Sequence, residues 1–177
     1  MARLTVAGLT GCMTALRTLS LIGATMTMGL AAGVFALYAH TIMPGLKSTD
    51  DRTFVAAFQA IDRAIINVWF MLSAFLGALV LTIIAAIAHR GAPALPWIAA
   101  ALGLYAVAVV VTAAINVPLN NAIKAAGDPG HVQDLAHVRQ RFHEARWAAW
   151  NLLRTATTTT AFGFLAWALV LHGRVTG

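Results

Sequence analysis

Four side chains in the C-terminal third of the chain have types and spacing that suit chemistry on a small flat molecule. They are His143, Trp147, Trp150 and Arg154. In an α-helix, with about 100° between successive residues, these positions fall within roughly 60° of one another, and Asn151 lies beside them. One helix face therefore combines an imidazole that titrates near neutral pH, two indoles that stack on rings, and a permanent cation.

Polar residues of other apolar segments are expected at the same level. In INVPLNNAI, Asn116 and Asn120 lie one turn apart, with Pro118 distorting the helix between them. The other residues expected there are Tyr38, His40, Gln59, Asp62 and Asn67. Polar groups inside a membrane are costly. Their gathering at one end, with few at the opposite end, therefore predicts a functional site.

The elements that must position these residues are membrane helices. The chain has 177 residues, is 60% hydrophobic and 10% charged, and has a mean hydropathy of +0.78, more than one soluble core requires. Apolar windows at 19–42, 64–88, 95–115 and 148–171 are long enough to cross a hydrocarbon layer of about 30 Å as helices. We therefore predict an all-α integral membrane four-helix bundle, a single transmembrane domain over residues 1–177.

The connections between the spans predict two further helical segments. After a Pro-Gly break, Ser48, Thr49 and Asp50 are candidate N-caps before apolar positions at helical spacing, which predicts a short amphipathic helix in the first loop. The polar stretch before residue 148 predicts a helical extension that leads into span four. An even number of spans places both termini on the same side of the membrane.

The charge pattern indicates a lipid bilayer as partner and excludes nucleic acid. The net charge of +6 comes from Lys and Arg residues that flank the spans, where they meet lipid headgroups. We expect a multi-pass protein of a bacterial cell membrane. Gly29 and Gly33 permit close helix approach, and glycine-rich spans are compatible with a homo-oligomer. Cys12 is the only cysteine, so a thiolate metal site is not expected.

Each polar residue also has a purely structural interpretation. Trp147 and Trp150 fit an interfacial aromatic belt, and Arg154 is close enough to the start of span four to extend back to the headgroups. Asparagines in spans often form interhelical hydrogen bonds. The convergence of all four spans on one level is what favours a site.

Four sequence motifs carry a family resemblance. They are MPGL at 43–46, FQAID at 58–62, NVPLNN at 116–121 and the pattern WxxWNxxRT at 147–155. With this order and spacing, from about residue 38 to residue 167, the chain resembles the anthrone oxygenase-like family of small four-span membrane proteins. The resemblance implies oxygenation of an anthrone to an anthraquinone in polyketide biosynthesis, with no metal or flavin cofactor.

The residues support a mechanism for such an oxygenase. Removing the acidic C–H of an anthrone gives an enolate that can transfer an electron to O2. His143 or Asp62 would be the base, and Arg154 would stabilise the negative charge that develops. The substrate would be a small, hydrophobic aromatic molecule. The other residues that bind it would be Trp147, Trp150, Asn151, Asn116, Asn120, Tyr38 and His40.

Two alternatives remain open at the level of sequence. His40 and His143 could ligate haem or copper from neighbouring helices, in a metal-dependent membrane oxidoreductase. The second alternative is a non-catalytic protein that binds a hydrophobic compound or packs against a membrane partner.

Overall fold

The computed structural model describes residues 2–176, and the side chains of residues 11–175. Within that range the chain is helical and contains no strand, which confirms the all-α class. Three helical stretches are long and apolar enough to cross a membrane: Gly11–Lys47, Val68–Ala88 and Leu95–Lys124. The fourth window lies in α9 (Glu144–Thr176), which packs along α1 (Ala2–Leu37) and α6 (Leu95–Val111). Its crossing of the membrane stays a prediction.

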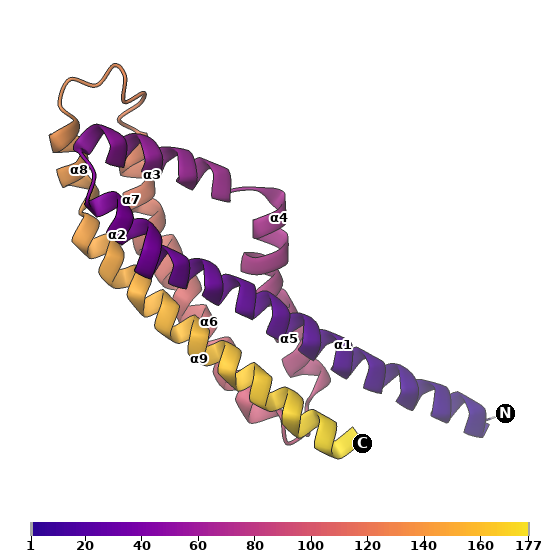
Figure 1. Ribbon diagram of the computed structural model, residues 1–177. Coiled ribbons are helices and arrows are strands. Elements are labelled where there is room, and N and C mark those ends of the chain that lie inside the picture. The colour runs from indigo at the N-terminus through magenta and orange to yellow at the C-terminus, as the bar shows by residue number, and fades with distance from the viewer. Residues whose placement is uncertain (1, 177) are drawn as a thin grey trace.

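The long helical stretches lie side by side in an elongated bundle (Figure 1). The first continues from α1 through the π-helical turn η1 (Tyr38–Ile42) into α2 (Met43–Lys47). The second contains α4 (Val68–Phe70), the π-helical turn η2 (Met71–Phe75) and α5 (Leu76–Ala88). The third contains α6, the π-helical turn η3 (Thr112–Asn116) and α7 (Val117–Lys124). In Figure 1, α1 begins and α9 ends at the same end of the bundle, opposite α8 (Leu135–Phe142).

The predicted amphipathic helix of the first loop is α3 (Asp51–Ile65), which buries Phe54, Val55 and Phe58. Of the three candidate N-caps, Asp50 is the cap, because its side chain accepts a hydrogen bond from the Thr53 backbone N–H. The second span begins at Val68 and not at residue 64, because the backbone leaves the helix at Ile66. The helix begins again with Asn67 as the N-cap of α4, where its side chain accepts a hydrogen bond from the Phe70 N–H.

The two segments that flank the third connection also differ from prediction. The third span continues as helix to Lys124, nine residues beyond the predicted end at residue 115. The helical extension before span four exists as α8, but His143 has the left-handed conformation, with φ 53°, and separates α8 from α9. It is therefore a separate helix.

Three of the long stretches contain a π-helical turn, and two of these turns precede a proline. Pro44 and Pro118 each occupy one of the first two positions of the following helix. A proline has no N–H to donate and crowds the carbonyl four residues earlier. For Pro44 and Pro118 that carbonyl belongs to His40 in η1 and to Ala114 in η3. The wider π turn therefore lets the helix continue past each proline.

Small residues dominate the core between the helices away from these turns. The buried positions include Ala24, Ala31, Ala78, Ala101, Ala108 and Ala161, packed around Leu21, Met28, Ile98 and Tyr105. A Cβ atom on Gly29 would lie only 3.0 Å from the Phe162 ring, so this glycine lets α1 approach α9 closely. Close packing of this kind supplies much of the attraction between helices in lipid.

Replacing Gly77 tests whether the π turn η2 is required. An added Cβ at Gly77 would collide with the backbone carbonyl of Leu72, which lies five residues earlier in that turn. We expect Gly77→Ala to destabilise the protein by about 1–3 kcal/mol, measured by thermal unfolding in detergent. Gly103→Ala on α6, where nothing lies within 4 Å of the added atom, is the control and should change little. Equal effects of the two substitutions would contradict the account.

Candidate active site

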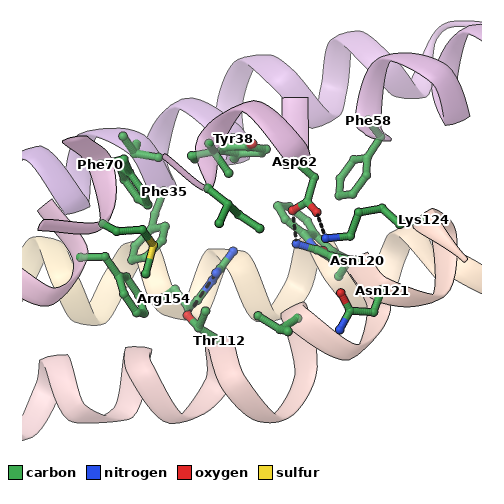
Figure 2. Close-up of a pocket in the computed structure, with 17 residues that line it drawn as sticks. Phe35, Tyr38, Phe58, Asp62, Phe70, Thr112, Asn120, Asn121, Lys124 and Arg154 are labelled. Carbon is green, nitrogen blue, oxygen red and sulfur yellow. Dashed lines mark hydrogen bonds and ion pairs between the residues drawn. The ribbon is translucent and has the colours of Figure 1, made fainter. Parts of the chain in front are cut away.

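A pocket of about 220 Å³ lies where the three π turns meet α9. Figure 2 shows its lining side chains converging from α1, α3, the second and third spans, and α9. The walls are mainly apolar, and polar groups stand at two opposite ends. The polar lining residues are Tyr38, Asp62, Thr112, Asn120, Asn121, Lys124 and Arg154. All four long helical stretches therefore contribute, as the sequence predicts.

One end of the pocket holds a buried cation with no carboxylate beside it. Arg154 is 6% exposed. Its guanidinium donates from Nη2 to Asn151 Oδ1 at 2.7 Å and from Nη1 to Thr112 Oγ1 at 3.1 Å, both neutral acceptors. It also lies over the rings of Phe35 and Trp147, with Cζ 4.5 Å and 5.5 Å from their centres. Its Nε has no hydrogen-bond partner within the described part of the chain.

The other end holds a carboxylate that is already neutralised. Asp62 Oδ2 lies 2.6 Å from Lys124 Nζ, and Asp62 Oδ1 accepts a 2.6 Å hydrogen bond from Asn120 Nδ2. Trp147 Nε1 donates in turn to Asn120 Oδ1 at 2.7 Å. Figure 2 shows Asp62 between Lys124 and Asn120. Two cations and one carboxylate leave the lining with one uncompensated positive charge, which belongs to Arg154.

Most of the predicted site residues meet at this pocket. Arg154, Asp62, Trp147, Asn120 and Tyr38 line it. Two more predicted residues lie outside the lining but form hydrogen bonds with residues that belong to it. Asn151 is fully buried and links Arg154 to the Phe35 backbone carbonyl, to which its Nδ2 donates at 3.0 Å. The buried Asn116 donates to the Trp147 carbonyl at 3.4 Å.

The other three predicted site residues also lie outside the pocket lining. His143 and His40 are exposed, and Trp150 is half-buried. The expectation that His143 shares one helix face with Trp147 and Arg154 is wrong. It assumed a continuous helix, whereas the left-handed backbone at His143 ends α8 and α9 begins at Glu144.

Sequence reasoning missed three residues that shape the pocket. Lys124 neutralises Asp62, Thr112 accepts from Arg154, and Phe35 stacks under the guanidinium. Thr112, Asn116, Asn120 and Lys124 follow one another at intervals of four residues, so this spacing was a signal for two of them. Nothing in the sequence sets Phe35 apart from the many other apolar residues of its span.

The opposite end of the bundle is more polar than expected. His89, which ends α5, is fully buried, and its Nε2 lies 3.4 Å from His172 Nδ1 on α9. The other ring nitrogen of His172 lies 2.9 Å from Thr18 Oγ1, and Arg17 Nε donates to the Ala88 carbonyl at 2.7 Å. Polar residues therefore meet at both ends of the bundle, but the cavity at this end is only about 40 Å³.

Comparison with protein families matches residues 58–164 of the chain to the model described as anthrone oxygenase. The chain belongs to the anthrone oxygenase family. The matched residues include Asp62, Asn120, Lys124, Trp147 and Arg154, so they contain both polar ends of the pocket. Comparisons with curated proteins and with solved structures give no match.

Among the side chains that the structure describes, no three of His, Cys, Asp or Glu are grouped so that they could hold a metal ion. His40, one of the two predicted alternative ligands for haem or copper, bonds through Nδ1 with the neighbouring Thr41 hydroxyl at 2.7 Å. The polar groups that line the pocket are a carboxylate, amides, hydroxyls, an indole N–H and two cations.

Removing Lys124 tests whether the Asp62 carboxylate depends on its partner. In Lys124→Met the carboxylate stays buried with one hydrogen bond, so the protein should lose about 2 kcal/mol or more of stability. The apparent Tm in detergent should fall by roughly 5 °C. Adding Asp62→Asn to this variant should recover part of the loss. The control is His131→Gln, which removes the exposed side-chain contact with Asp128 and should cost under about 1 kcal/mol.

Acid should destabilise the histidine pair at the opposite end. Burial lowers the pKa of His89 and outweighs the hydrogen bond to the Ala85 carbonyl, which raises it, while electrostatic interactions with His172 and Arg17 lower it further. Below the ordinary histidine pKa of about 6.5, His89 becomes protonated in the unfolded chain but stays neutral in the folded one. The free energy of unfolding therefore declines as the pH falls. The apparent Tm should therefore be lower at pH 5.5 than at pH 8. The difference should shrink in His89→Gln, and an unchanged difference would contradict this assignment.

Proposed function

We propose that this protein is a membrane oxygenase that converts an anthrone-like ketone into the corresponding quinone with O2 and without a bound cofactor. For anthrone itself the balance is anthrone plus O2 gives anthraquinone plus water. The family, the largely apolar pocket and the buried cation support this proposal. We also propose that it acts in aromatic polyketide biosynthesis, in a bacterial cell membrane.

The reaction begins when a base removes the C–H proton opposite the carbonyl of the substrate. The resulting enolate passes one electron to O2, and the carbon radical and superoxide combine into a peroxide anion, which takes up a proton. Loss of the second C–H proton, with cleavage of the O–O bond and departure of water, leaves the second carbonyl. The protein must accept and return protons. It must also stabilise negative charge, first on the enolate oxygen and then on the superoxide and the peroxide.

Asp62 is the candidate base that the pocket favours, because its carboxylate faces the cavity whereas His143 is exposed. The ammonium of Lys124, 2.6 Å away, can supply a proton to the peroxide. The Trp147 indole, held by Asn120, forms a flat wall for the ring system. Arg154 would receive the enolate oxygen at the opposite end.

The single observation that carries the proposal is the guanidinium of Arg154, buried against neutral partners. Burying an unpaired charge is expensive, and here hydrogen bonds and two ring faces offset only part of that cost. An anion that forms during the reaction would complete the pairing. Such a preformed cation in a site of low dielectric stabilises the transition state more than the neutral substrate.

Substitution of Arg154 tests the proposal directly. With 1,8-dihydroxyanthrone as substrate, we expect Arg154→Gln to lower kcat/KM by about 100-fold or more, measured from O2 consumption and quinone absorbance. Arg154→Lys should retain part of the activity, because it keeps the charge and loses the forked donor geometry. The control is Arg174→Gln at the opposite end of the bundle, where the guanidinium lies over Trp167. Wild-type turnover by a folded Arg154→Gln protein would refute the proposal.

The same preparation separates the alternatives. Binding of the anthrone without O2 consumption would indicate a binding protein. A visible absorption band, or stoichiometric copper or iron in the active protein, would indicate the metal-dependent alternative.

A further inference from the structure

The pocket has one exposed rim. Among its lining residues only Ile66, Val117 and Asn121 are exposed, with Ile66 at 61% and Val117 at 42%. Those from α1, α3 and α9 are buried or half-buried. Ile66 occupies the bend between α3 and α4, and Val117 and Asn121 occupy α7. We call these three residues the pocket mouth, and it lies between the second and third spans.

The end of the pocket that faces α3 and α8 is closed by aromatic side chains. Phe54, Phe58, Phe142 and Trp147 are almost completely buried and contact one another, with centroids 4.5 Å apart for Phe58 and Phe142. Arg139 holds α8 against the first loop and the start of α9. It donates to the Lys47 and Thr49 carbonyls and forms ion pairs with Asp51 and Glu144. A substrate coming from water on the side of α3 and α8 would have to disrupt this layer.

The opposite, deeper end of the pocket is closed as well. Arg154 and Thr112 are bonded to each other there, next to the alanine-rich core, and half-buried Phe70, Met71 and Phe75 line the pocket on the side of the second span. Tyr105, fully buried in α6, donates to the Phe75 carbonyl at 2.8 Å and ties the second span to the third at this level. The most exposed part of the lining is therefore the pocket mouth, between the second and third spans.

The surroundings of the pocket mouth match the boundary between hydrocarbon and headgroups. Large apolar side chains next to Ile66 are highly exposed, namely Val68, Trp69 and Leu72. On the facing helix, exposed Val117 is followed one turn later by Asn121 and then by Lys124, the last residue of the third span. One rim is thus suited to acyl chains, and the other changes from apolar to polar at the end of the span.

We propose that the substrate enters the pocket sideways from the bilayer, through the mouth formed by Ile66, Val117 and Asn121. This inference rests on the proposed function, since it concerns the substrate of that reaction. It defines the substrate as a flat lipophile that partitions into the membrane and carries its polar edge at headgroup level. Such a molecule passes Ile66 and Val117 with its rings while its oxygen atoms pass Asn121. O2, which also concentrates in hydrocarbon, reaches the pocket by the same route.

Reversible blocking of the mouth tests this route. In a Cys12→Ala background, Ile66→Cys is reconstituted in phosphatidylcholine nanodiscs and modified with benzyl methanethiosulfonate, which attaches a bulky disulfide that dithiothreitol removes. The matched control is Leu72→Cys, whose position is 62% exposed against 61% for Ile66 and lies outside the pocket lining. Turnover of 1,8-dihydroxyanthrone is measured before modification, after it, and after reduction, in the same sample. A variant that failed to fold would therefore be recognised.

A second measurement does not depend on turnover. A small lipophilic aryl diazirine, dissolved in the nanodisc lipid and photolysed, should label pocket residues such as Phe70 and Trp147, identified by mass spectrometry. We expect modification of Ile66→Cys to lower both turnover and this labelling by about tenfold or more, with recovery on reduction and no effect for Leu72→Cys.

The outcomes separate the two proposals. Full turnover or full pocket labelling with the mouth blocked overturns entry through the mouth. If the unmodified protein does not oxidise the anthrone, the proposed function fails, and the labelling experiment still decides whether the bilayer feeds the pocket.

Discussion

The organisation of this protein depends on holding one guanidinium inside a membrane bundle without a carboxylate partner. Arg154 is accommodated because Asn151 and Thr112 accept hydrogen bonds from its guanidinium and because two aromatic rings cover its faces. Two of these partners are themselves held by hydrogen bonds. Asn151 donates to the Phe35 carbonyl, and Trp147 donates to Asn120. A series of contacts therefore runs from Arg154 through Trp147 and Asn120 to Asp62 and Lys124.

The three π turns explain how tightly packed helices leave room for this network. The alanine-rich half of the bundle brings the backbones close, and little space remains there for a ligand. At the pocket, π turns widen the first, second and third stretches at one level. The widening lets Pro44 and Pro118 remain inside continuous helix, and it frees the Phe75 carbonyl to accept from Tyr105. The cavity is thus built into the backbone rather than left by small side chains.

Much of the fold was predictable because it follows from hydropathy and capping. The apolar windows gave three spans, and Asp50 was among the candidate caps that define α3. The convergence of Arg154, Asp62, Asn120, Trp147 and Tyr38 was predictable from the cost of polar groups in lipid. The place of His143 was not predictable, because a single left-handed residue interrupts the helix without changing the hydropathy pattern. Lys124 was overlooked for a related reason, since the π turn and Pro118 obscure the end of the third span.

The bend at Ile66 and Asn67 has a mechanical consequence. It joins an amphipathic helix, whose polar face belongs among lipid headgroups, to a span that must match the hydrocarbon layer. A thicker or thinner bilayer changes the tilt of the span but not the plane in which α3 lies, so the mismatch is absorbed at this joint. Ile66 is part of that joint. For the proposed route of entry, the width of the passage beside it, and with it the rate at which substrate reaches the pocket, should therefore follow the acyl-chain length of the surrounding lipids.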